Sequence, residues 1–233
     1  MMDKKISIIL STYNEASFIE ETINEILNNI KNVEIILVDD SSSDGTLEKV
    51  KNIGNPNIKI FSRKLRGLAS AFLLGLINSS GDIVGWVDSN MKSAAAKLPE
   101  MIDQLNNNEI VLLSRYVEGG DDKRDKFRSF ASRFLNWIYQ LTLSKKIKDY
   151  TSGMFVMKRS VLLTAIPNCF GHGEFFVEFI YKAHKRNVKI YELPFIQPPD
   201  LEKRSKTASS LLHFIHLGFH YMGVIFHART RRN

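Results

Sequence analysis

The sequence predicts an α/β fold with a mostly parallel sheet, helices on both faces, and amphipathic helices at the C-terminus. Its 233 residues suit one such domain. With 44% hydrophobic and 24% charged residues, the composition is that of a globular chain and excludes disorder as the main state. Short apolar runs alternate with stretches of helical periodicity, which is typical of parallel strands joined by helices.

Each predicted element has its own signal. Short aliphatic runs predict strands at 6–10, 34–38, 58–61, 83–87 and 110–113. Between them, apolar residues at helical spacing predict helices at 17–28, 46–53, 68–77 and 98–105. A later segment, 127–143, places aromatic residues on one helical side and Arg128 with Ser132 on another.

Polar and acidic residues follow three of the predicted strands. The loops read S-T-Y-N-E from Ser11, D-D-S-S-S-D-G-T from Asp39 and D-S-N from Asp88. In parallel sheets, ligands bind beyond the carboxyl ends of the strands. Helix capping explains one acidic residue in such a loop, but it does not explain the adjacent carboxylates of Asp39 and Asp40. We therefore expect this pair to serve ligand binding.

Charge is divided unequally along the chain, whose 32 basic and 25 acidic side chains give a net charge of +7. Residues 1–122 carry 12 basic and 18 acidic side chains, net −6, and residues 123–233 carry 20 and 7, net +13. The acidic half suits a cation or a ribose, and the basic half suits phosphate or an anionic surface. Nucleic acid is disfavoured as a partner, because the basic residues accompany a long apolar segment.

Two features bear on cellular location. Cys169 is the only cysteine and cannot form an intramolecular disulfide, which favours a reducing, cytosolic environment. Residues 1–5 lead into the first predicted strand without an apolar signal region. We therefore expect that the protein is not exported.

The C-terminal segment 211–233 differs in character from residues 1–210. Residues 211–226 form an apolar stretch that contains His213, His216 and His220, and three arginines follow it. This stretch is too short and too polar for a membrane span and is typical of a helix at a membrane interface. Metal binding by the histidine row, and a packed helix or dimer contact, are the alternatives.

Several motifs taken together resemble the family 2 glycosyltransferases of the GT-A fold. They are S-T-Y-N-E, V-D-D-S-S-S-D-G-T, R-G-L-A-S-A-F-L-L-G-L and S-G-D-I-V-G-W-V-D-S-N. Three later pieces are similar to the dolichol- or polyprenol-phosphate sugar synthases, especially those of mannose type. These pieces are S-R-Y-V-E-G-G from Ser114, D-Y-T-S-G from Asp149, and Ser205-Lys206. The resemblance covers about residues 5–210 and implies one catalytic domain over residues 1–210.

The resemblance implies a site for a nucleotide-sugar donor. Tyr13 and Glu15 match positions that contact the base and ribose, and Asp40 matches the position that binds the base edge. Carboxylates suit these tasks because they accept paired N–H or O–H donors. The donor-binding residues implied in this way are Ser11, Tyr13, Glu15, Val38, Asp40 and Lys92.

The resemblance also implies Mg²⁺ or Mn²⁺ at Asp88 and Asn90. Asp88 matches the first aspartate of the family's D-x-D motif, but Asn90 stands at the second acidic position and Lys92 where the family often has glutamine. Three interpretations stay open. The metal is held weakly by Asp88, Asn90 and the diphosphate, Lys92 replaces it, or the site has lost catalysis.

On the acceptor side, the resemblance implies that Arg115, Arg128 and Ser132 contact a lipid phosphate or the diphosphate. Lys206 would close over the donor. Such a phosphate is already ionised, so its attack needs positioning and charge neutralisation more than a general base. Glu178 lies in an apolar helical stretch, where we expect it to pair with an arginine of the site.

We predict an inverting glycosyltransferase that moves a sugar from GDP-mannose or a UDP-sugar to a polyprenyl or dolichyl phosphate. We expect it at the cytoplasmic face of a membrane, bound peripherally to the anionic surface. One alternative is a family 2 enzyme with a glycan or other hydroxyl acceptor, which would need a carboxylate base. Another is a donor-binding homologue without turnover. The sequence leaves open whether the protein forms a homo-oligomer.

Overall fold

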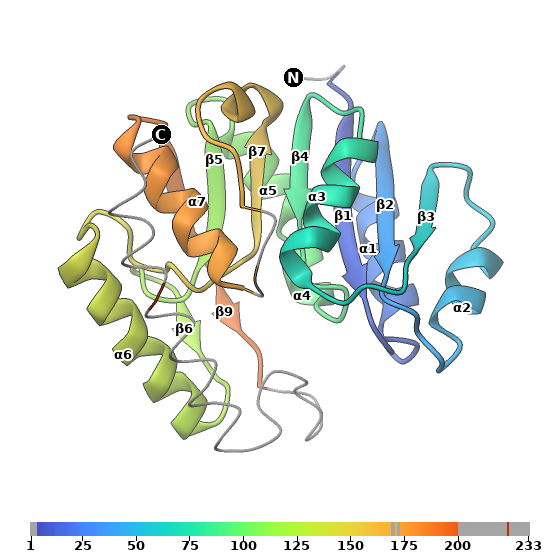
Figure 1. Ribbon diagram of the computed structural model, residues 1–233, viewed down its shortest axis with the longest axis horizontal. Coiled ribbons are helices and arrows are strands. Elements are labelled where there is room, and N and C mark those ends of the chain that lie inside the picture. The colour runs from blue at the N-terminus through green and yellow to red at the C-terminus, as the bar shows by residue number, and fades with distance from the viewer. Residues whose placement is uncertain (1–3, 169–170, 172, 200–222, 224–233) are drawn as a thin grey trace.

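The computed structural model describes residues 4–168, 171, 173–199 and 223 (Figure 1). Its centre is a seven-stranded sheet in the order β3-β2-β1-β4-β7-β5-β8. The strands are β1 (Ile6–Thr12), β2 (Val33–Asp39), β3 (Ile58–Ser62), β4 (Ile83–Trp86), β5 (Ile110–Ser114), β7 (Phe155–Lys158) and β8 (Ile190–Pro194). Strand β7 runs antiparallel to β4 and β5, and the other pairs are parallel. The predicted fold class, α/β with a mostly parallel sheet, is confirmed.

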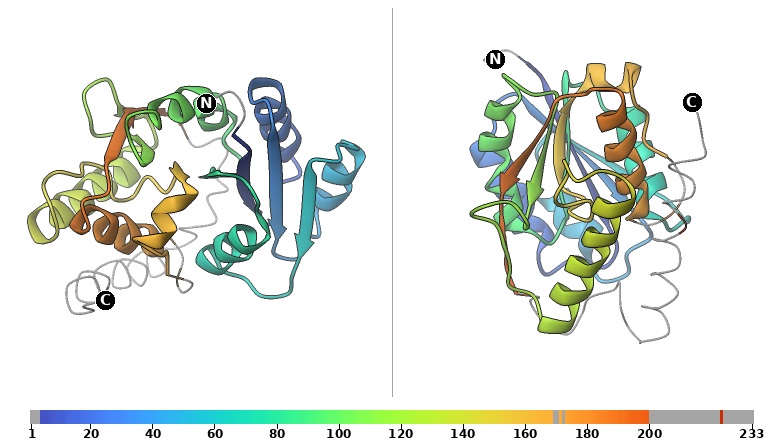
Figure 2. Two further views of the ribbon diagram at one scale, coloured as in Figure 1. Left: turned by 90° about the horizontal axis from the view of Figure 1, so that it is seen from above. Right: turned by 90° about the vertical axis from the view of Figure 1, so that its left-hand side faces the viewer.

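Helices cover both faces of this sheet (Figures 1 and 2). One face packs against α1 (Ile19–Asn29), α2 (Thr46–Asn52), α4 (Lys92–Ala95) and α5 (Leu98–Gln104). The other packs against α3 (Leu68–Asn78), α7 (Glu174–Lys185) and the short helix η1 (Arg159–Leu163). Each face therefore has its own hydrophobic core.

Burial of both faces explains why the strands are apolar at nearly every position, since successive side chains point to opposite faces. In β1, Ile8 and Leu10 belong to the core under α1, and Ile9 belongs to the core under α3. Gly75 of α3 lies directly over Ile9, where a Cβ would overlap the Ile9 side chain. The glycine lets α3 approach the sheet closely.

A smaller layer extends beyond the carboxyl ends of the parallel strands. Strands β6 (Asp121–Asp122) and β9 (Ile196–Gln197) pair in parallel, and α6 (Lys126–Thr142) begins four residues after β6. Helix α6 lies at the periphery, at the lower left of Figure 1. Its N-terminus is capped by Asp125, whose side chain accepts hydrogen bonds from the amides of Phe127 and Arg128, both at 3.0 Å.

All five predicted strands and four predicted helices are present, with ends shifted by a few residues. Strands β7 and β8 and the short β6 and β9 were not predicted. Strand β7 is only four residues long, and β8 interrupts its apolar residues with Glu192, so neither has a strong local signal. Within the described residues, no helix is long and apolar enough to cross a membrane. Lys206 and the predicted interfacial segment 211–233, apart from Gly223, lie outside the described residues.

Candidate active site

The carboxyl ends of β1, β2, β4 and β5 meet at one edge of the sheet, the lower edge in Figure 1. The residues that follow these strands include Tyr13 and Glu15, then Asp40, Asp88 and Arg115. The topology therefore gathers most of the predicted site residues at this edge. Two donor-binding predictions concern the strands themselves. Ser11 is half-buried, and Val38 is fully buried in the core, so a donor could reach only its backbone.

Asp39 and Asp40 point to different partners, although they are adjacent. Asp39 is buried and accepts hydrogen bonds from the Thr12 hydroxyl at 2.8 Å and the Ser42 amide at 2.9 Å. Asp40 accepts from Arg63 Nε at 2.6 Å and from the Gly67 amide at 3.1 Å. Asp39 thus joins the loops after β1 and β2, and Asp40 holds the loop between β3 and α3.

Two arginines beside these acids were not singled out as site residues. The Arg63 guanidinium also donates to Ser70 Oγ at 2.9 Å and to the Gly67 carbonyl at 2.6 Å. The Arg66 guanidinium carbon lies 3.7 Å from the centre of the Tyr13 ring, so the cation covers that aromatic face. A base that stacks on this face of Tyr13 must displace Arg66. Arg66 is the first residue of the R-G-L-A-S motif, and this motif is the sequence feature that could have identified it as a site residue.

Asp88 follows β4 and is half-buried. Burial and the neighbouring Glu15 carboxylate raise its pKa to about 6, against the opposing charges of Arg115 and Arg124. Asn90 is exposed in the same loop. Lys92 begins α4 and is also exposed, with its ammonium 3.9 Å from Glu21 of α1. In the part of the chain that the structure describes, no three His, Cys, Asp or Glu side chains form a metal-binding group.

Arg115 is buried, with 5% of its surface exposed, in a bidentate pair with Asp149. Its Nε and Nη2 atoms donate to the two carboxylate oxygens at 2.8 and 2.7 Å, and its backbone amide donates to Asp149 at 3.0 Å. Burial alone would lower the pKa of Arg115, but Asp149 raises it well above its usual value. Glu192 of β8 accepts from the Asp149 amide at 2.9 Å and fixes this turn. Arg115 is thus a permanent buried cation that orders residues 149–151.

The inner face of α6 meets the same turn. Arg115 Nη2 donates to Thr151 Oγ1 at 2.7 Å, and Ser132 Oγ lies 3.2 Å from that oxygen. Asn136, one helical turn after Ser132, donates to Thr151 Oγ1 at 2.7 Å. The structure therefore brings Arg115 and Ser132 together through Thr151. Arg128 lies in the first turn of α6 and is half-buried.

A second cluster joins Arg115 to the start of α6. Asp122 accepts a bidentate pair from Arg124 at 2.8 and 2.7 Å, and its Oδ2 lies 3.7 Å from Arg115 Nη1. The Tyr116 hydroxyl donates to Asp122 at 3.3 Å, and the centre of its ring lies 5.0 Å from the guanidinium carbon of Arg115 and 5.3 Å from that of Arg133. These roles of Asp122, Arg124, Tyr116 and Asn136 were not predicted, since none of these residues stands out locally.

One expectation on α7 needs correction. Glu178 is buried and pairs with Lys182 at 2.7 Å, one turn away on its own helix, where an arginine of the site was expected. It also accepts from Asn168 at 3.2 Å. A cation four residues along the same helix offsets the buried charge, because the helix already holds the two side chains close together. Glu174, the first residue of α7, is half-buried, and its Oε2 is covered.

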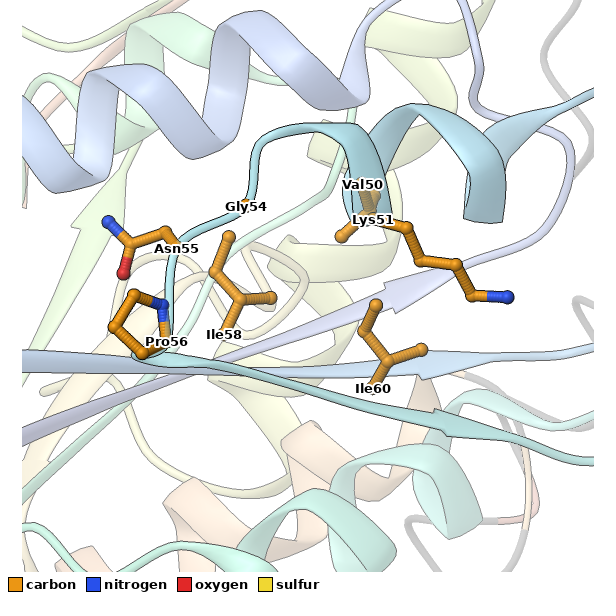
Figure 3. A pocket seen from close by; sticks show the side chains of 7 residues that line it. All are labelled: Val50, Lys51, Gly54, Asn55, Pro56, Ile58 and Ile60. Carbon is orange, nitrogen blue, oxygen red and sulfur yellow. The ribbon is translucent and has the colours of Figure 1, made fainter.

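A hollow of about 200 Å³ lies away from this edge, between the end of α2 and the start of β3 (Figure 3). Its lining is mainly aliphatic, and Lys51 is the charged residue in it. None of the predicted site residues contributes to its wall. We therefore place the candidate site at the carboxyl edge of the sheet and not in this hollow.

Open α/β sheets bind their ligands beyond the carboxyl ends of the strands, and this chain places its acidic loops and the buried Arg115 there. Residues 7–164 match the model of glycosyl transferase family 2, and the chain belongs to this family. The resemblance stated from the motifs is confirmed at the family level.

Two curated relatives are named as transferases for a lipid phosphate. A dolichol-phosphate mannosyltransferase of Pyrococcus furiosus is 32% identical over 199 residues, which cover 82% of this chain and 56% of the relative. An undecaprenyl-phosphate 4-deoxy-4-formamido-L-arabinose transferase of Edwardsiella ictaluri is 25% identical over 195 residues, covering 79% of this chain and 58% of the relative. The chain thus spans a little over half the length of these relatives.

Solved structures agree with the fold. Glucosyl-3-phosphoglycerate synthase of Mycobacterium tuberculosis, in complex with phosphoglyceric acid, matches with a TM-score of 0.76 and 17% identity, over 100% of this chain and 82% of that chain. The same enzyme in complex with Mn²⁺, UDP and glucosyl-3-phosphoglycerate matches with a TM-score of 0.72, 17% identity and the same coverage. These matches support the GT-A-like fold.

Proposed function

We propose that this glycosyltransferase moves a sugar from a nucleoside diphosphate to a polyprenyl or dolichyl phosphate at a membrane surface, with inversion. The observation that carries the proposal is the two-sided character of α6. Its inner face contacts the Arg115 and Thr151 network of the candidate site. Its outer face is apolar and exposed. An acceptor with a phosphate head and a hydrocarbon tail fits these two faces at once.

The outer face is a continuous apolar stripe. Its members recur every three or four residues and are each more than half exposed: Phe127, Phe130, Phe134, Trp137 and Leu141. Neighbouring rings stack, with centroids 6.4 Å apart for Phe130 and Phe134 and 5.9 Å for Phe134 and Trp137. An exposed apolar patch of this kind on a protein surface marks an interaction site, and aromatic residues are favoured at membrane interfaces. Lys123 and Lys126 before the stripe, and Lys145 and Lys146 after it, would face anionic headgroups.

The acceptor chemistry explains the basic residues. A phosphate monoester brings its own anionic nucleophile, so the protein has to orient it and offset its charge. We assign the contacts to Arg115, Arg128, Ser132 and Lys206, of which Lys206 is outside the described residues. Arg115 would contribute mainly as a fixed charge, because Asp149 and Thr151 already use much of its hydrogen-bonding capacity.

On the donor side, we assign the base and ribose to Tyr13, Glu15 and Asp40, and we place Mg²⁺ or Mn²⁺ at Asp88 and Asn90. Oxygen ligands suit both cations. The raised pKa of Asp88, caused by burial and by Glu15, supports the fit, because a bound cation would relieve both effects. The ion would act as a Lewis acid for the departing diphosphate. Solved relatives that carry UDP with Mn²⁺ or Mg²⁺ support the assignment.

A transfer assay tests the proposal. The purified chain is incubated with radiolabelled GDP-mannose or UDP-glucose, with vesicles that contain undecaprenyl or dolichyl phosphate, and with or without Mn²⁺. We expect a lipid-extractable labelled product. Label on an added glycan, with none on the lipid, would favour the hydroxyl-acceptor alternative. Nucleotide binding by calorimetry without any product would favour the donor-binding alternative.

A further inference from the structure

Thr151 lies where the buried Arg115 meets α6, and both acceptor positions of its hydroxyl oxygen are occupied. Arg115 Nη2 and Asn136 Nδ2 each donate to Oγ1 at 2.7 Å. The orientation of the Asn136 amide follows from its other partners. Its Oδ1 accepts from the Tyr150 amide at 2.7 Å, and its Nδ2 donates to the Ser132 carbonyl at 2.9 Å. Asn136 is 1% exposed, so these bonds face no competition from bulk water.

A hydroxyl oxygen has two acceptor positions and one hydrogen to donate. Because the acceptor positions of Thr151 are taken, it can only donate to its remaining neighbours, Ser132 Oγ at 3.2 Å and Asp149 Oδ1 at 3.3 Å. In either case Thr151 cannot accept the hydrogen of Ser132. The Ser132 hydrogen must therefore point to another acceptor.

The phenol oxygen of Tyr116 is the candidate acceptor for this hydrogen. Burial raises the pKa of Tyr116, and the Arg115 charge and then a hydrogen bond with Ser132 oppose the rise. The Tyr116 hydroxyl in turn donates to Asp122 at 3.3 Å. A phosphate oxygen is a stronger hydrogen-bond acceptor than a neutral phenol. An arriving phosphate would therefore replace Tyr116 as the acceptor of the Ser132 hydrogen.

We propose that Thr151 is a positioning residue for the acceptor phosphate. With Arg115 and Asn136 filling its acceptor positions, Thr151 keeps the Ser132 hydroxyl oriented as a hydrogen-bond donor towards the incoming anion. The inference rests on the proposed function, in which Ser132 contacts that phosphate. It assigns Thr151 and Asn136 a role that acts through Ser132 and not by direct contact.

Kinetics of three single variants test the role. Thr151→Val keeps the shape and removes the hydroxyl, and we expect KM for undecaprenyl phosphate to rise about tenfold while KM for the nucleotide sugar stays unchanged. Thr151→Ser restores the hydroxyl and should return KM to within about twofold of the parent. Thr142→Val removes a hydroxyl of α6 that donates to the Ile138 carbonyl at 2.7 Å, away from Thr151, and it should leave both values unchanged.

A variant of Asn136 changes the direction of the hydrogen bonds at Thr151. Asn136→Asp still accepts from the Tyr150 amide but no longer donates to Thr151. Thr151 can then donate to the new carboxylate and accept from Ser132, so the acceptor KM should again rise about tenfold. This variant keeps the inference testable if Thr151→Val does not fold, which thermal denaturation would reveal.

A double variant tests whether Thr151 acts through Ser132. In a Ser132→Ala background, adding Thr151→Val should cause no further loss, because the group that Thr151 positions is already gone. A multiplicative loss in the double variant, or a Thr151→Val enzyme with parental acceptor KM, would overturn the inference and leave the proposed function intact. Absence of transfer to any lipid phosphate by the parent would overturn both.

Discussion

Single residues at the site owe their roles to partners far away in the sequence. Arg115 and Asp149 are 34 residues apart and form a buried bidentate pair, and Asp40 is held by Arg63 from the loop before α3. A buried ion pair of this kind contributes little net stability, but removal of one partner leaves an unpaired buried charge. Arg115 therefore serves first to order the 149–151 turn that meets α6.

Replacing Arg115 should separate stability from activity. Arg115→Met leaves the Asp149 carboxylate unpaired and should lower the free energy of unfolding by about 3–5 kcal/mol, measured by urea denaturation. The double variant Arg115→Met with Asp149→Leu should recover much of that loss, whereas sugar transfer should stay lost. The exposed ion pair of Lys97 with Glu100 offers a control, since Lys97→Met should cost less than about 1 kcal/mol. A double variant no more stable than the single one would contradict the prediction.

Glu34 of β2 should make the free energy of unfolding depend on pH. Burial would raise its pKa, but hydrogen bonds from Ser7, Ser80 and Lys59 outweigh burial and hold the pKa well below its usual value. The folded state therefore binds a proton at Glu34 less readily than the unfolded chain does. This contribution is fully present above about pH 5 and is lost as the pH falls below the unfolded value near 4.5.

The substitution Glu34→Gln tests this dependence. At pH 7 it should lower the free energy of unfolding by about 1–3 kcal/mol, because the buried donors lose a charged acceptor. At pH 3.5 the difference from the parent should shrink, since the parent loses part of its own stabilisation. Urea denaturation at the two pH values measures both differences. An equal loss at both would show that the Glu34 charge is not the source.

At the scale of elements, α6 has two faces of different character. Asn136 and Tyr139 are its buried residues, and Asn136 fastens the helix to Tyr150 and Thr151 through hydrogen bonds. An ordinary surface helix would present polar residues on the opposite side. The exposed aromatic stripe departs from that pattern, which is why we assign this face to a lipid surface.

Charged substitutions in the stripe should weaken membrane binding and leave the donor site intact. Phe134→Glu or Trp137→Glu removes an apolar side chain whose burial in a membrane interface is worth about 1.5–3 kcal/mol. Cosedimentation with anionic vesicles should therefore fall at least severalfold, while calorimetry should find nucleotide binding unchanged. Leu163→Glu, in the short helix η1, is the matched control, because Leu163 is 91% exposed outside the stripe. Equal losses for Leu163→Glu would argue against a specific role of α6.

At the scale of the whole molecule, charge and topology are organised together. The acidic half supplies the loops after β1, β2 and β4, and the basic half supplies α6 and the residues after it. The two halves join where β7 pairs with β4 on one side and with β5 on the other. The proposed donor and acceptor regions therefore share one edge of the sheet.

This charge distribution predicts that membrane binding depends on salt. Attraction between the basic half and anionic lipid is screened as the Debye length falls from about 10 Å at 0.1 M to about 3 Å at 1 M salt. Binding to phosphatidylserine vesicles should weaken over this range, and binding to neutral vesicles should change little. A salt response that is equal for both lipids would contradict an electrostatic contribution.

Local patterns determined a large part of this protein. The first five strands, four of the five helices between them and the acidic loops at the strand ends follow from apolar periodicity and chain position, as Ile8, Leu10 and Asp88 illustrate. The family also followed from motifs within single loops. These features depend on neighbours in sequence, so the sequence alone predicts them.

Tertiary structure decided what depends on distant partners. The insertion of the four-residue β7 between β4 and β5, the pairing of Arg115 with Asp149, and the choice of Lys182 as partner of Glu178 have no strong local signal. Hydrogen bonds and ion pairs select their partners by position in space, and that position exists only after the sheet has assembled. For this reason the sequence by itself determined which residues reach the edge of the sheet, and the folded chain decided which of them meet.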